Sequence, residues 1–350
     1  MEKNIMRKLM PVFLRLLSLL AAIWGLLSTT PSWAEGLAGY KADPDSVTIS
    51  GVSSGGAQAV QAHVAYSGTF RGAAVFAGTP YYCAQGQLAN FAPCALNPHD
   101  IPVKALAETT RNWAEQGLID PVANLRNSKV YLFSGTRDAI VRPAAMDALL
   151  DYYRQFVPAD RIRYVNDVPA AHAWVSPQAA GECGKQKAPY LNHCDIDPQK
   201  DFLGLFYGEL KPKATSLHGR LISFDQAEFI DGDAAQISMD RHAWLFVPPA
   251  CAQGETCRLH VALHGCGQAH AVIGQAFMQQ SGLNPWAETN RILVLYPQVR
   301  PSLMSPFNPE GCWDWWGYTG SHYAQKSAPQ LRAIKRMVDR LTSGAGKGKP

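Results

Sequence analysis

"GVSSGG", residues 51–56, follows the β-prone run at 47–49 and precedes a segment rich in small residues. Within it, Gly51, Ser53 and Gly55 form the pattern Gly-x-Ser-x-Gly. A nucleophilic serine on a sharp turn between a strand and a helix needs small neighbours, because larger side chains would collide with the tight backbone. The flanking segments fit a strand and a helix. The stretch therefore predicts a nucleophile elbow, although an ordinary flexible glycine turn is the alternative.

The first half of the chain alternates β-rich and helical segments, from residue 47 to about residue 175. This alternation is typical of a parallel sheet with crossover helices. We predict a surface loop or small excursion at 77–97, where aromatic residues and two cysteines gather. The predicted strands are 47–49, 71–76, 130–133 and 161–165, and the predicted helices are 55–66 and 144–156.

Candidate partners for the serine follow two of these strands. A serine attacks poorly unless a histidine accepts its proton and a carboxylate orients that histidine. Asp138 in "VYLFSGTRDAIV" follows one predicted strand by a short loop, and His172 in "NDVPAAHAWV" follows the next. The order Ser53, Asp138, His172 is that of the α/β-hydrolases. Asp167 is an alternative carboxylate, but it lies at a strand end rather than in the expected loop.

The second half of the chain supplies a loop that an oxyanion hole requires. The tetrahedral intermediate of acyl transfer needs two backbone N–H donors, and Ser54, the residue after the nucleophile, provides one. The loop 264–267 in "RLHVALHGCGQ" follows a buried strand and is a candidate for the second. In an ordinary hydrolase this loop precedes the nucleophile, whereas here it follows His172.

A circular permutation accounts for this order. Placing the second half of the chain before the first restores the usual hydrolase succession, with the original ends joined near 195–218, a segment read as a connection. The predicted elements of the second half are antiparallel strands at 221–224 and 243–247, strands at 258–263 and 292–296, a helix around Gln275 and a closing helix with Leu331, Ile334, Val338 and Leu341 on one face. The fold class is therefore predicted to be a circularly permuted α/β-hydrolase with a mostly parallel sheet flanked by helices.

Five motifs, "GVSSGG", "SGTRDAIV", "HAWV", "LHVALHGCGQ" and "GCWDWWGY", together resemble the circularly permuted, type II catalytic domain of extracellular polyhydroxybutyrate depolymerases. The resemblance covers nearly all of the mature chain. It implies that Ser53, Asp138 and His172 form a triad and that the amides of Ser54 and Cys266 form the oxyanion hole. It also implies disulfides between neighbouring cysteines: Cys83–Cys94, Cys183–Cys194, Cys251–Cys257 and Cys266–Cys312.

The amino-terminal segment has the order of a secretory signal, with basic residues, an apolar stretch and a small-residue site ending at Ala34. A membrane anchor is the alternative. Removing residues 1–34 takes away four basic residues and one acidic residue, so the net charge of +4 falls to +1. No basic stripe for nucleic acid remains. We expect a signal peptide at 1–34, a single catalytic domain at 35–343 and a disordered tail at 344–350, in a secreted, extracellular or periplasmic protein without a stable membrane anchor.

The eight cysteines of an exported chain predict disulfides, since an oxidising compartment lets them persist. Spacing alone leaves about 105 connectivities open. Metal binding is the alternative for the cysteines, but no Cys-x-x-Cys pair is present. Cys266 as a free thiol is a further alternative that the serine makes unnecessary. No metal and no organic cofactor is expected.

An aromatic cluster at Trp313, Trp315, Trp316 and Tyr318 fits either the core or an apolar wall for an aliphatic ester chain. Trp313, beside Cys312, and Trp174, two residues after His172, are the candidate substrate-binding residues. We predict a monomeric serine esterase that hydrolyses poly(3-hydroxybutyrate) or its oligomers through an acyl-enzyme. A feruloyl or acetyl carbohydrate esterase and a non-catalytic secreted binding protein are the alternatives.

Overall fold

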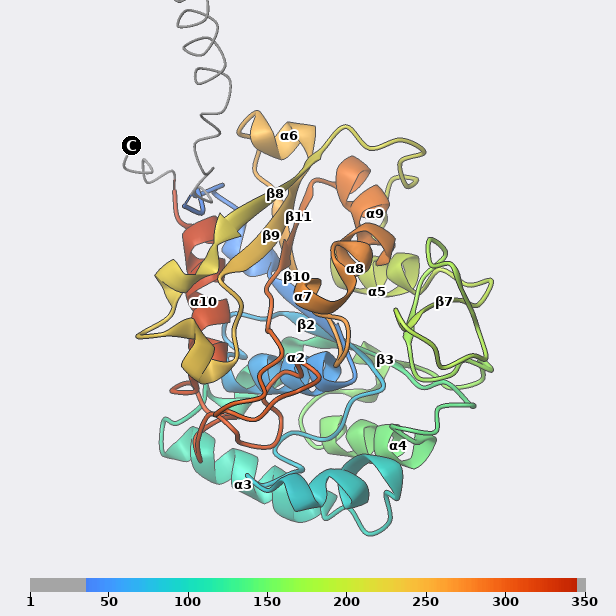
Figure 1. Ribbon diagram of the computed structural model, residues 1–350, viewed down its shortest axis with the longest axis vertical. Helices are drawn as coiled ribbons and strands as arrows, with labels where there is room; N and C mark the ends of the chain where they lie inside the picture. The colour runs from blue at the N-terminus through green and yellow to red at the C-terminus, as the bar shows by residue number, and fades with distance from the viewer. Residues whose placement is uncertain (1–35, 345–350) are drawn as a thin grey trace, which may run out of the picture. The chain divides into compact units, whose positions relative to one another are not determined.

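The computed structural model describes residues 36–344. The predicted signal peptide at 1–34 and the tail from 345 onward lie outside the described residues. Figure 1 shows a central sheet with helices packed around it. Among residues 36–344, no helix is both long enough and apolar enough to cross a bilayer.

Eight strands form the central sheet, in the order β4-β3-β2-β1-β10-β11-β9-β8. The six strands from β4 to β11 in this order pair in parallel, β9 is antiparallel to β11, and β8 is antiparallel to β9. Their bounds are β1 Thr48–Val52, β2 Gly72–Phe76, β3 Lys129–Phe133, β4 Ile162–Val165, β8 Arg220–Asp225, β9 His242–Val247, β10 Arg258–Leu263 and β11 Ile292–Tyr296. The fold class predicted from the sequence is confirmed: the sheet is mostly parallel and flanked by helices.

The sheet order carries the signature of the permutation. If β8 to β11 are read before β1 to β4, the order in space follows the order along the chain except that β10 and β11 are exchanged. The two halves meet in the middle of the sheet, where β1 pairs with β10 and Thr48 lies opposite His260. The strand that precedes Ser53 and the strand that precedes the 264–267 loop are therefore direct neighbours.

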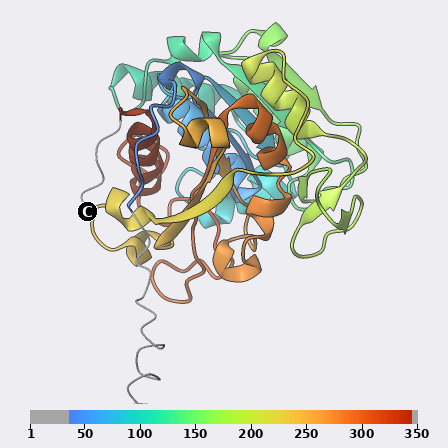
Figure 2. The same cartoon turned by 90° about the horizontal axis from the view of Figure 1, so that it is seen from above.

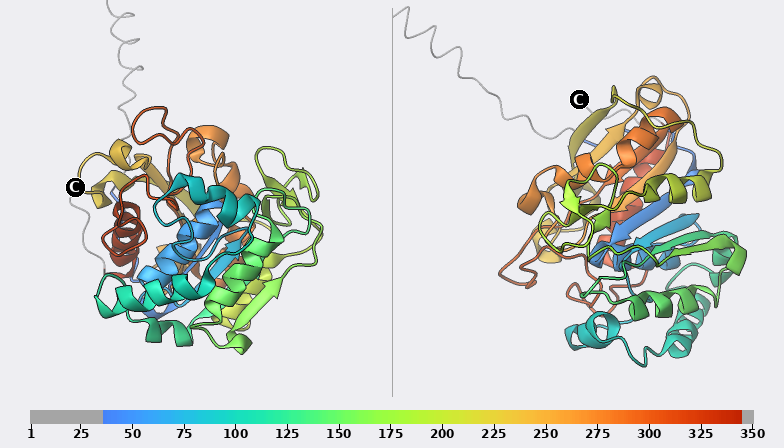
Figure 3. Two further views of the ribbon diagram at one scale, coloured as in Figure 1. Left: turned by 90° about the horizontal axis from the view of Figure 1, so that it is seen from below. Right: turned by 90° about the vertical axis from the view of Figure 1, so that its right-hand side faces the viewer.

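Alternate side chains of the strands enter two separate cores, as the period of two of a β-strand requires. In β2, Val75 packs into one core and Phe76 into the other. Helices α2, α3, α4 and α10 cover the first core, and α5, α8 and α9 cover the second. Figure 2 and Figure 3 show helices on both faces of the sheet from three further directions.

The helices include several that the sequence analysis did not predict. Among these are α3 and α9. The sequence analysis also did not predict the small parallel sheet of β5, β7 and β6. The bounds are α2 Ser54–Ala65, α3 Val103–Glu115, α4 Pro143–Tyr153, α5 Pro198–Tyr207, α6 Pro249–Ala252, α7 His270–Ile273, α8 Ala276–Gln280, α9 Leu283–Asn290, α10 Pro329–Thr342, β5 Trp174–Val175, β6 Gly181–Glu182 and β7 Leu191–His193.

The segment 195–218 is not merely a connection, because it contains α5. Asp197 caps this helix by accepting a hydrogen bond from the backbone N–H of Lys200 at 3.2 Å, and Pro198 occupies the first turn. Phe202 and Leu203 are buried in the second core. The segment was predicted only as a connection, whereas it also contains a helix whose apolar residues cover the sheet.

Four disulfides join neighbouring cysteines, Cys83–Cys94, Cys183–Cys194, Cys251–Cys257 and Cys266–Cys312. Three of them close loops with a sequence separation of 6 or 11 residues, while Cys266–Cys312 spans 46. The described residues contain no free cysteine. The long disulfide connects the loop after β10 to the segment before α10.

Candidate active site

Ser53 lies on the turn between β1 and α2 with φ of 57° and ψ of −123°. A non-glycine residue with positive φ is strained and persists only where its surroundings enforce it. The surroundings here leave no room beside it: a Cβ on Gly51 would lie 2.1 Å from the Gly55 carbonyl oxygen, and one on Gly55 would lie 2.2 Å from the His264 carbonyl oxygen. Both glycines are thus required by close backbone approach, and the turn presents Ser53 above the end of the sheet.

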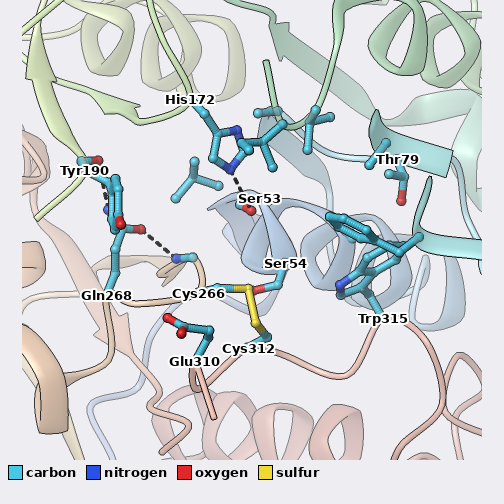
Figure 4. A pocket seen from close by; sticks show the side chains of 18 of the residues that line it. Ser53, Ser54, Thr79, His172, Tyr190, Cys266, Gln268, Glu310, Cys312 and Trp315 are labelled. Carbon is cyan, nitrogen blue, oxygen red and sulfur yellow. Dashed lines mark hydrogen bonds between the residues drawn. A yellow bond between two sulfur atoms is a disulfide. The ribbon is translucent and has the colours of Figure 1, made fainter. Parts of the chain in front are cut away.

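The structure brings Ser53, His172 and Asp138 into one hydrogen-bonded row. His172 Nε2 lies 2.9 Å from Ser53 Oγ (Figure 4), and His172 Nδ1 lies 2.8 Å from Asp138 Oδ2. The neutral tautomer that fits both contacts donates its Nδ1 proton to the carboxylate and accepts the serine proton at Nε2. Asp167 is exposed and makes no hydrogen bond or ion pair with His172.

Asp138 is fixed by its own loop. Its Oδ1 accepts hydrogen bonds from the backbone N–H groups of Ile140 and Val141, both at 2.9 Å. Its side chain is 2% exposed, whereas that of His172 is 12% exposed. The carboxylate is therefore sealed from water and aimed at the imidazole, while the imidazole still reaches the pocket.

The loop 264–267 lies directly against the elbow. A Cβ on Gly265 would lie 3.2 Å from Ser53 Cβ. The backbone N–H groups of Ser54 and Cys266 have no hydrogen-bond acceptor among residues 36–344. Ser54 opens α2, where N–H groups lack intrahelical partners. Ser54 and Cys266 line the same pocket as Ser53, so their N–H groups are candidate donors to an oxyanion.

Gln268, which the sequence analysis did not single out, holds this loop. Its Oε1 accepts from the Gly265 N–H at 2.7 Å, and its Nε2 donates to the carbonyl oxygens of Pro189 and Tyr190 at 3.1 and 2.9 Å. Pro189 and Tyr190 belong to the loop that Cys183–Cys194 closes. The buried amide of Gln268 thus connects the loop 264–267, called here the oxyanion loop, to the disulfide-closed loop that carries Tyr190 (Figure 4).

The "GCWDWWGY" segment, residues 311–318, contacts both the turn that carries Ser53 and the loop 264–267. Cys312 is bonded to Cys266, and the backbone N–H of Trp313 donates to Ser54 Oγ at 3.2 Å. Asn308 fixes Cys312 through both its amide atoms: it accepts from the Cys312 N–H and donates to the Cys312 carbonyl, each at 2.8 Å. The residue after the nucleophile and the oxyanion loop are therefore anchored to the same segment.

Asp314 sets the direction of the tryptophans in this segment. Its carboxylate accepts from the backbone N–H groups of Gly317, Tyr318 and Thr319 at 2.7, 3.0 and 2.8 Å. Burial raises the pKa of this carboxyl, and these donors oppose the rise. The resulting turn places Trp315 and Trp316 at the pocket.

Ser53 opens into a pocket of about 540 Å³. Leu88, Phe91, Ile140, Val141, Trp315 and Trp316 line it with apolar surface, and Gln186, Tyr190, Gln268 and Glu310 line it with polar groups. Figure 4 shows Trp315 and Thr79 on one side of the Cys266–Cys312 disulfide and Tyr190, Gln268 and Glu310 on the other. The segment 77–97, predicted as a surface loop, therefore also contributes to the pocket.

The proposed substrate-binding role of Trp313 and Trp174 must be corrected, because neither lines the pocket. Both side chains are fully buried. Trp174 donates its indole N–H to the Ser281 carbonyl at 2.9 Å and packs 4.4 Å from the Phe76 ring. Trp313 packs 5.6 Å from the His264 ring. Both are core residues, and Trp315 and Trp316 line the pocket instead.

Three further histidines are fully buried and are not part of the row at Ser53. Burial lowers the pKa of His63 and of His260 to about 3 and that of His264 to about 4. His260 bridges Thr48 Oγ1 and Ser50 Oγ, each at 2.8 Å. His264 lies 2.8 Å from the Gly265 carbonyl oxygen through Nδ1, which steadies the start of the oxyanion loop. All three are neutral structural groups.

Similarity to known proteins was found at the level of whole chains, although no protein-family model matches. A poly(3-hydroxybutyrate) depolymerase of Delftia acidovorans is 46% identical over 319 residues, which cover 89% of this chain and 63% of the relative. A polyhydroxybutyrate depolymerase of Talaromyces funiculosus is 36% identical over 327 residues, which cover 89% of this chain and 94% of the relative. The chain thus spans less than two thirds of the Delftia protein's length.

Two solved structures have the same fold at 35% sequence identity and a TM-score of 0.82. One is a PHB depolymerase from Penicillium funiculosum, and the other is a serine-to-alanine variant of a PHB depolymerase complexed with an R3HB trimer. Each match covers 89% of this chain and 100% of the other.

Proposed function

This chain belongs to the polyhydroxybutyrate depolymerase family, and we propose that it is a serine esterase that hydrolyses poly(3-hydroxybutyrate) or its oligomers. The observation that carries the proposal is the row of Asp138, His172 and Ser53 beside two unpaired backbone N–H groups at the end of an apolar pocket. An acyl-transfer site needs these parts together.

The reaction proceeds in two halves. In the first, His172 Nε2 takes the Ser53 proton while Ser53 Oγ bonds to the ester carbonyl carbon, and the resulting oxyanion accepts from the N–H groups of Ser54 and Cys266. The carbon–oxygen bond to the leaving group breaks as His172 protonates the leaving hydroxyl. In the second, His172 deprotonates a water that attacks the acyl-enzyme, and Ser53 leaves with its proton restored. Asp138 remains ionised and stabilises the imidazolium throughout.

The pocket supports an aliphatic ester as the substrate. A chain of 3-hydroxybutyrate units carries a methyl group on each unit and no charge along its interior, so apolar walls can accept it without leaving a charge unpaired. Leu88, Phe91, Trp315 and Trp316 offer such a wall next to Ser53. A related structure holds an R3HB trimer, which supports the same class of substrate here.

Product analysis tests the proposal. The enzyme is incubated in parallel with amorphous polymer, crystalline polymer and soluble hydroxybutyrate oligomers, and the released hydroxy acids are measured by mass spectrometry. We expect release by the wild type and none by Ser53→Ala, while Ser216→Ala, at an exposed serine outside the pocket, retains full release. A fluorophosphonate probe labels the wild type but not Ser53→Ala.

Two results would contradict the proposal. Faster turnover of methyl ferulate than of hydroxybutyrate trimer would assign the site to carbohydrate esters. Absence of fluorophosphonate labelling in the folded wild type would assign the protein to a non-catalytic binding role.

We propose that the enzyme works outside the cytoplasm, in the periplasm or the extracellular medium, as a monomer without a membrane anchor. Four disulfides and the absence of a free cysteine in the described residues support an oxidising compartment. The mass of the protein recovered from culture medium or periplasm tests this proposal, since cleavage after Ala34 removes residues 1–34.

A further inference from the structure

The polar side of the pocket contains an unpaired carboxylate at Glu310. The backbone carbonyl of Glu310 accepts from the Gly267 N–H at 2.7 Å, which fixes this residue next to the oxyanion loop. Its Oε2 lies 3.8 Å from the position of a Cβ on Gly267, and Tyr190 lines the same side. Figure 4 shows the carboxylate beside Cys266, across the disulfide from Trp315.

No cation balances this carboxylate. Among residues 36–344, no side-chain nitrogen of Lys, Arg or His lies within 4.0 Å of the Glu310 carboxylate oxygens, and this side chain makes no hydrogen bond. The lining of the pocket contains no Lys or Arg. Lys185 and Lys187 belong to the neighbouring disulfide-closed loop but do not line the pocket. Glu310 therefore contributes an exposed carboxylate without an ion-pair partner to the lining of the pocket.

The two ends of a hydroxybutyrate chain respond differently to such a site. One end is a neutral hydroxyl, whereas the other is a carboxylate that is ionised at neutral pH. On the side of Trp315 and Phe91 the carboxylate would lose water without gaining a partner, and on the side of Tyr190 it would meet Glu310. Ester groups in the interior of the chain carry no charge and incur neither cost.

We propose that Glu310 is a specificity-determining residue that disfavours a free carboxylate end of the substrate and directs cleavage to neutral ester segments. The proposal rests on the proposed function and deepens it by naming the part of the chain that the pocket accepts. Glu310 acts through its charge and takes no part in proton transfer at Ser53.

The test compares the methyl ester of hydroxybutyrate trimer with the free acid, using the ratio of their kcat/KM values at low ionic strength. Because the intrinsic reactivity of the two substrates is the same for every variant, it cancels when the ratio is compared between variants. We expect the wild type to favour the ester and Glu310→Gln to reduce that preference by about two- to fivefold, which is the scale of one solvent-exposed charge pair. Glu310→Asp keeps the preference, and Glu310→Lys reduces it further than Glu310→Gln.

Two controls separate this charge effect from other causes. Glu108→Gln removes an equivalent exposed charge from α3, outside the pocket, and leaves the ratio unchanged. Added salt lowers the wild-type ratio, because screening weakens exposed charge pairs. A ratio unaffected by Glu310→Gln, or affected equally by Glu108→Gln, overturns the inference while the proposed function stands. If the wild type hydrolyses neither compound, the proposed function fails and the inference fails with it.

Discussion

The two halves of the chain contribute different kinds of group to the site. The half from β1 to β5 supplies the hydrogen-bonded row of Ser53, Asp138 and His172, to which we assign proton transfer. The half from β8 to α10 supplies the 264–267 loop and the Cys312 segment, whose groups keep their positions while charge develops beside them. In the proposed mechanism, one half of the chain therefore supplies the groups that transfer protons and the other supplies backbone N–H groups that stay in place.

The bonds that hold these groups differ accordingly. Ser53, Asp138 and His172 each lie in the loop or turn after a strand, and the side chain of Ser53 makes one hydrogen bond while that of His172 makes two. The oxyanion loop is bonded on several sides, by the disulfide of Cys266, by Gln268 and by the carbonyl of Glu310. Substitutions in the first half should remove the reaction and leave stability intact, whereas substitutions in the second half should affect both.

The largest separation of activity from stability is expected for Asp138→Asn. The amide keeps an oxygen for the N–H groups of Ile140 and Val141, but it stabilises the wrong tautomer of His172. We expect kcat to fall by about 10⁴-fold with the urea midpoint nearly unchanged. Steady-state kinetics and urea unfolding measure the two quantities. The matched control is Asp167→Asn, which retains activity; an equal loss in that variant would exchange the roles of the two carboxylates.

In the second half, the double variant Cys266→Ala with Cys312→Ala should change both quantities. Opening a disulfide that spans 46 residues lowers the free energy of unfolding by about 4 kcal/mol in the chain-entropy account. The freed loop also loses its fixed amide, so kcat falls by about tenfold or more. The Cys251–Cys257 disulfide has a sequence separation of 6 and lies away from the pocket. Removing it should lower the free energy of unfolding by about 2 kcal/mol and leave kcat unchanged. Equal effects on kcat in both variants would contradict a specific brace.

Buried histidines should make both halves sensitive to acid. The folded pKa of His63 and His260 is about 3 and that of His264 about 4, below the ordinary histidine value. The unfolded chain therefore binds more protons below about pH 6.5, and the free energy of unfolding falls as the pH drops from there toward 4. Each histidine accounts for roughly 2 to 3 kcal/mol between pH 7 and pH 4.5.

Urea midpoints measured across this pH range test the expectation. His63→Gln should reduce the slope of unfolding free energy against pH by about one proton, because Gln does not titrate. A slope that is unchanged in this variant would show that His63 is not a source of the acid sensitivity.

The smallest expected effect on kcat is that of Gln268→Leu. This variant best separates support of the oxyanion loop from general stability. Gln268→Leu removes the bonds to Gly265, Pro189 and Tyr190, so the oxyanion loop loses its tie to the pocket wall and kcat falls by roughly tenfold. Gln226 makes a similar set of bonds, to Asp240 and twice to Gln298, but outside the pocket. Gln226→Leu should destabilise the fold to a similar degree with kcat unchanged. Both variants are compared by kcat and by urea midpoint, and equal losses of kcat would assign Gln268 to general stability.

The sequence predicted that Ser53, Asp138 and His172 would lie together because each of them follows a strand that has a clear local signal. Asp138 and His172 follow such strands, and Ser53 lies between two required glycines. The strands β10 and β11 have the predicted bounds, because short continuous apolar runs of this length are typical of fully buried strands. Parallel strands then bring the three residues together without further information.

The pocket wall was predicted less well, because its direction depends on contacts that the sequence does not display. The "GCWDWWGY" segment lacks any periodicity, and its turn at Asp314, held by bonds to 317–319, leaves Trp315 at the pocket and Trp313 in the core. Gln268 ends the "LHVALHGCGQ" motif and Glu310 precedes "GCWDWWGY", but no sequence signal marks the role of either side chain, so only their neighbours in space reveal them. In 195–218 the signals of a helix were present in Asp197 and Pro198 but were obscured by the Pro, Lys and Gly around them.

The pairing of β1 with β10 has a consequence for the order of biosynthesis. Thr48 is made early, yet its partner His260 leaves the ribosome 212 positions later. A nascent polypeptide that ends before Cys312 contains Ser53, Asp138 and His172 but cannot form the disulfide that fixes its oxyanion loop. In the proposed mechanism, a chain released before Cys312 has the nucleophile without the disulfide that fixes the Cys266 amide, so we expect it to hydrolyse esters more slowly than the full-length chain.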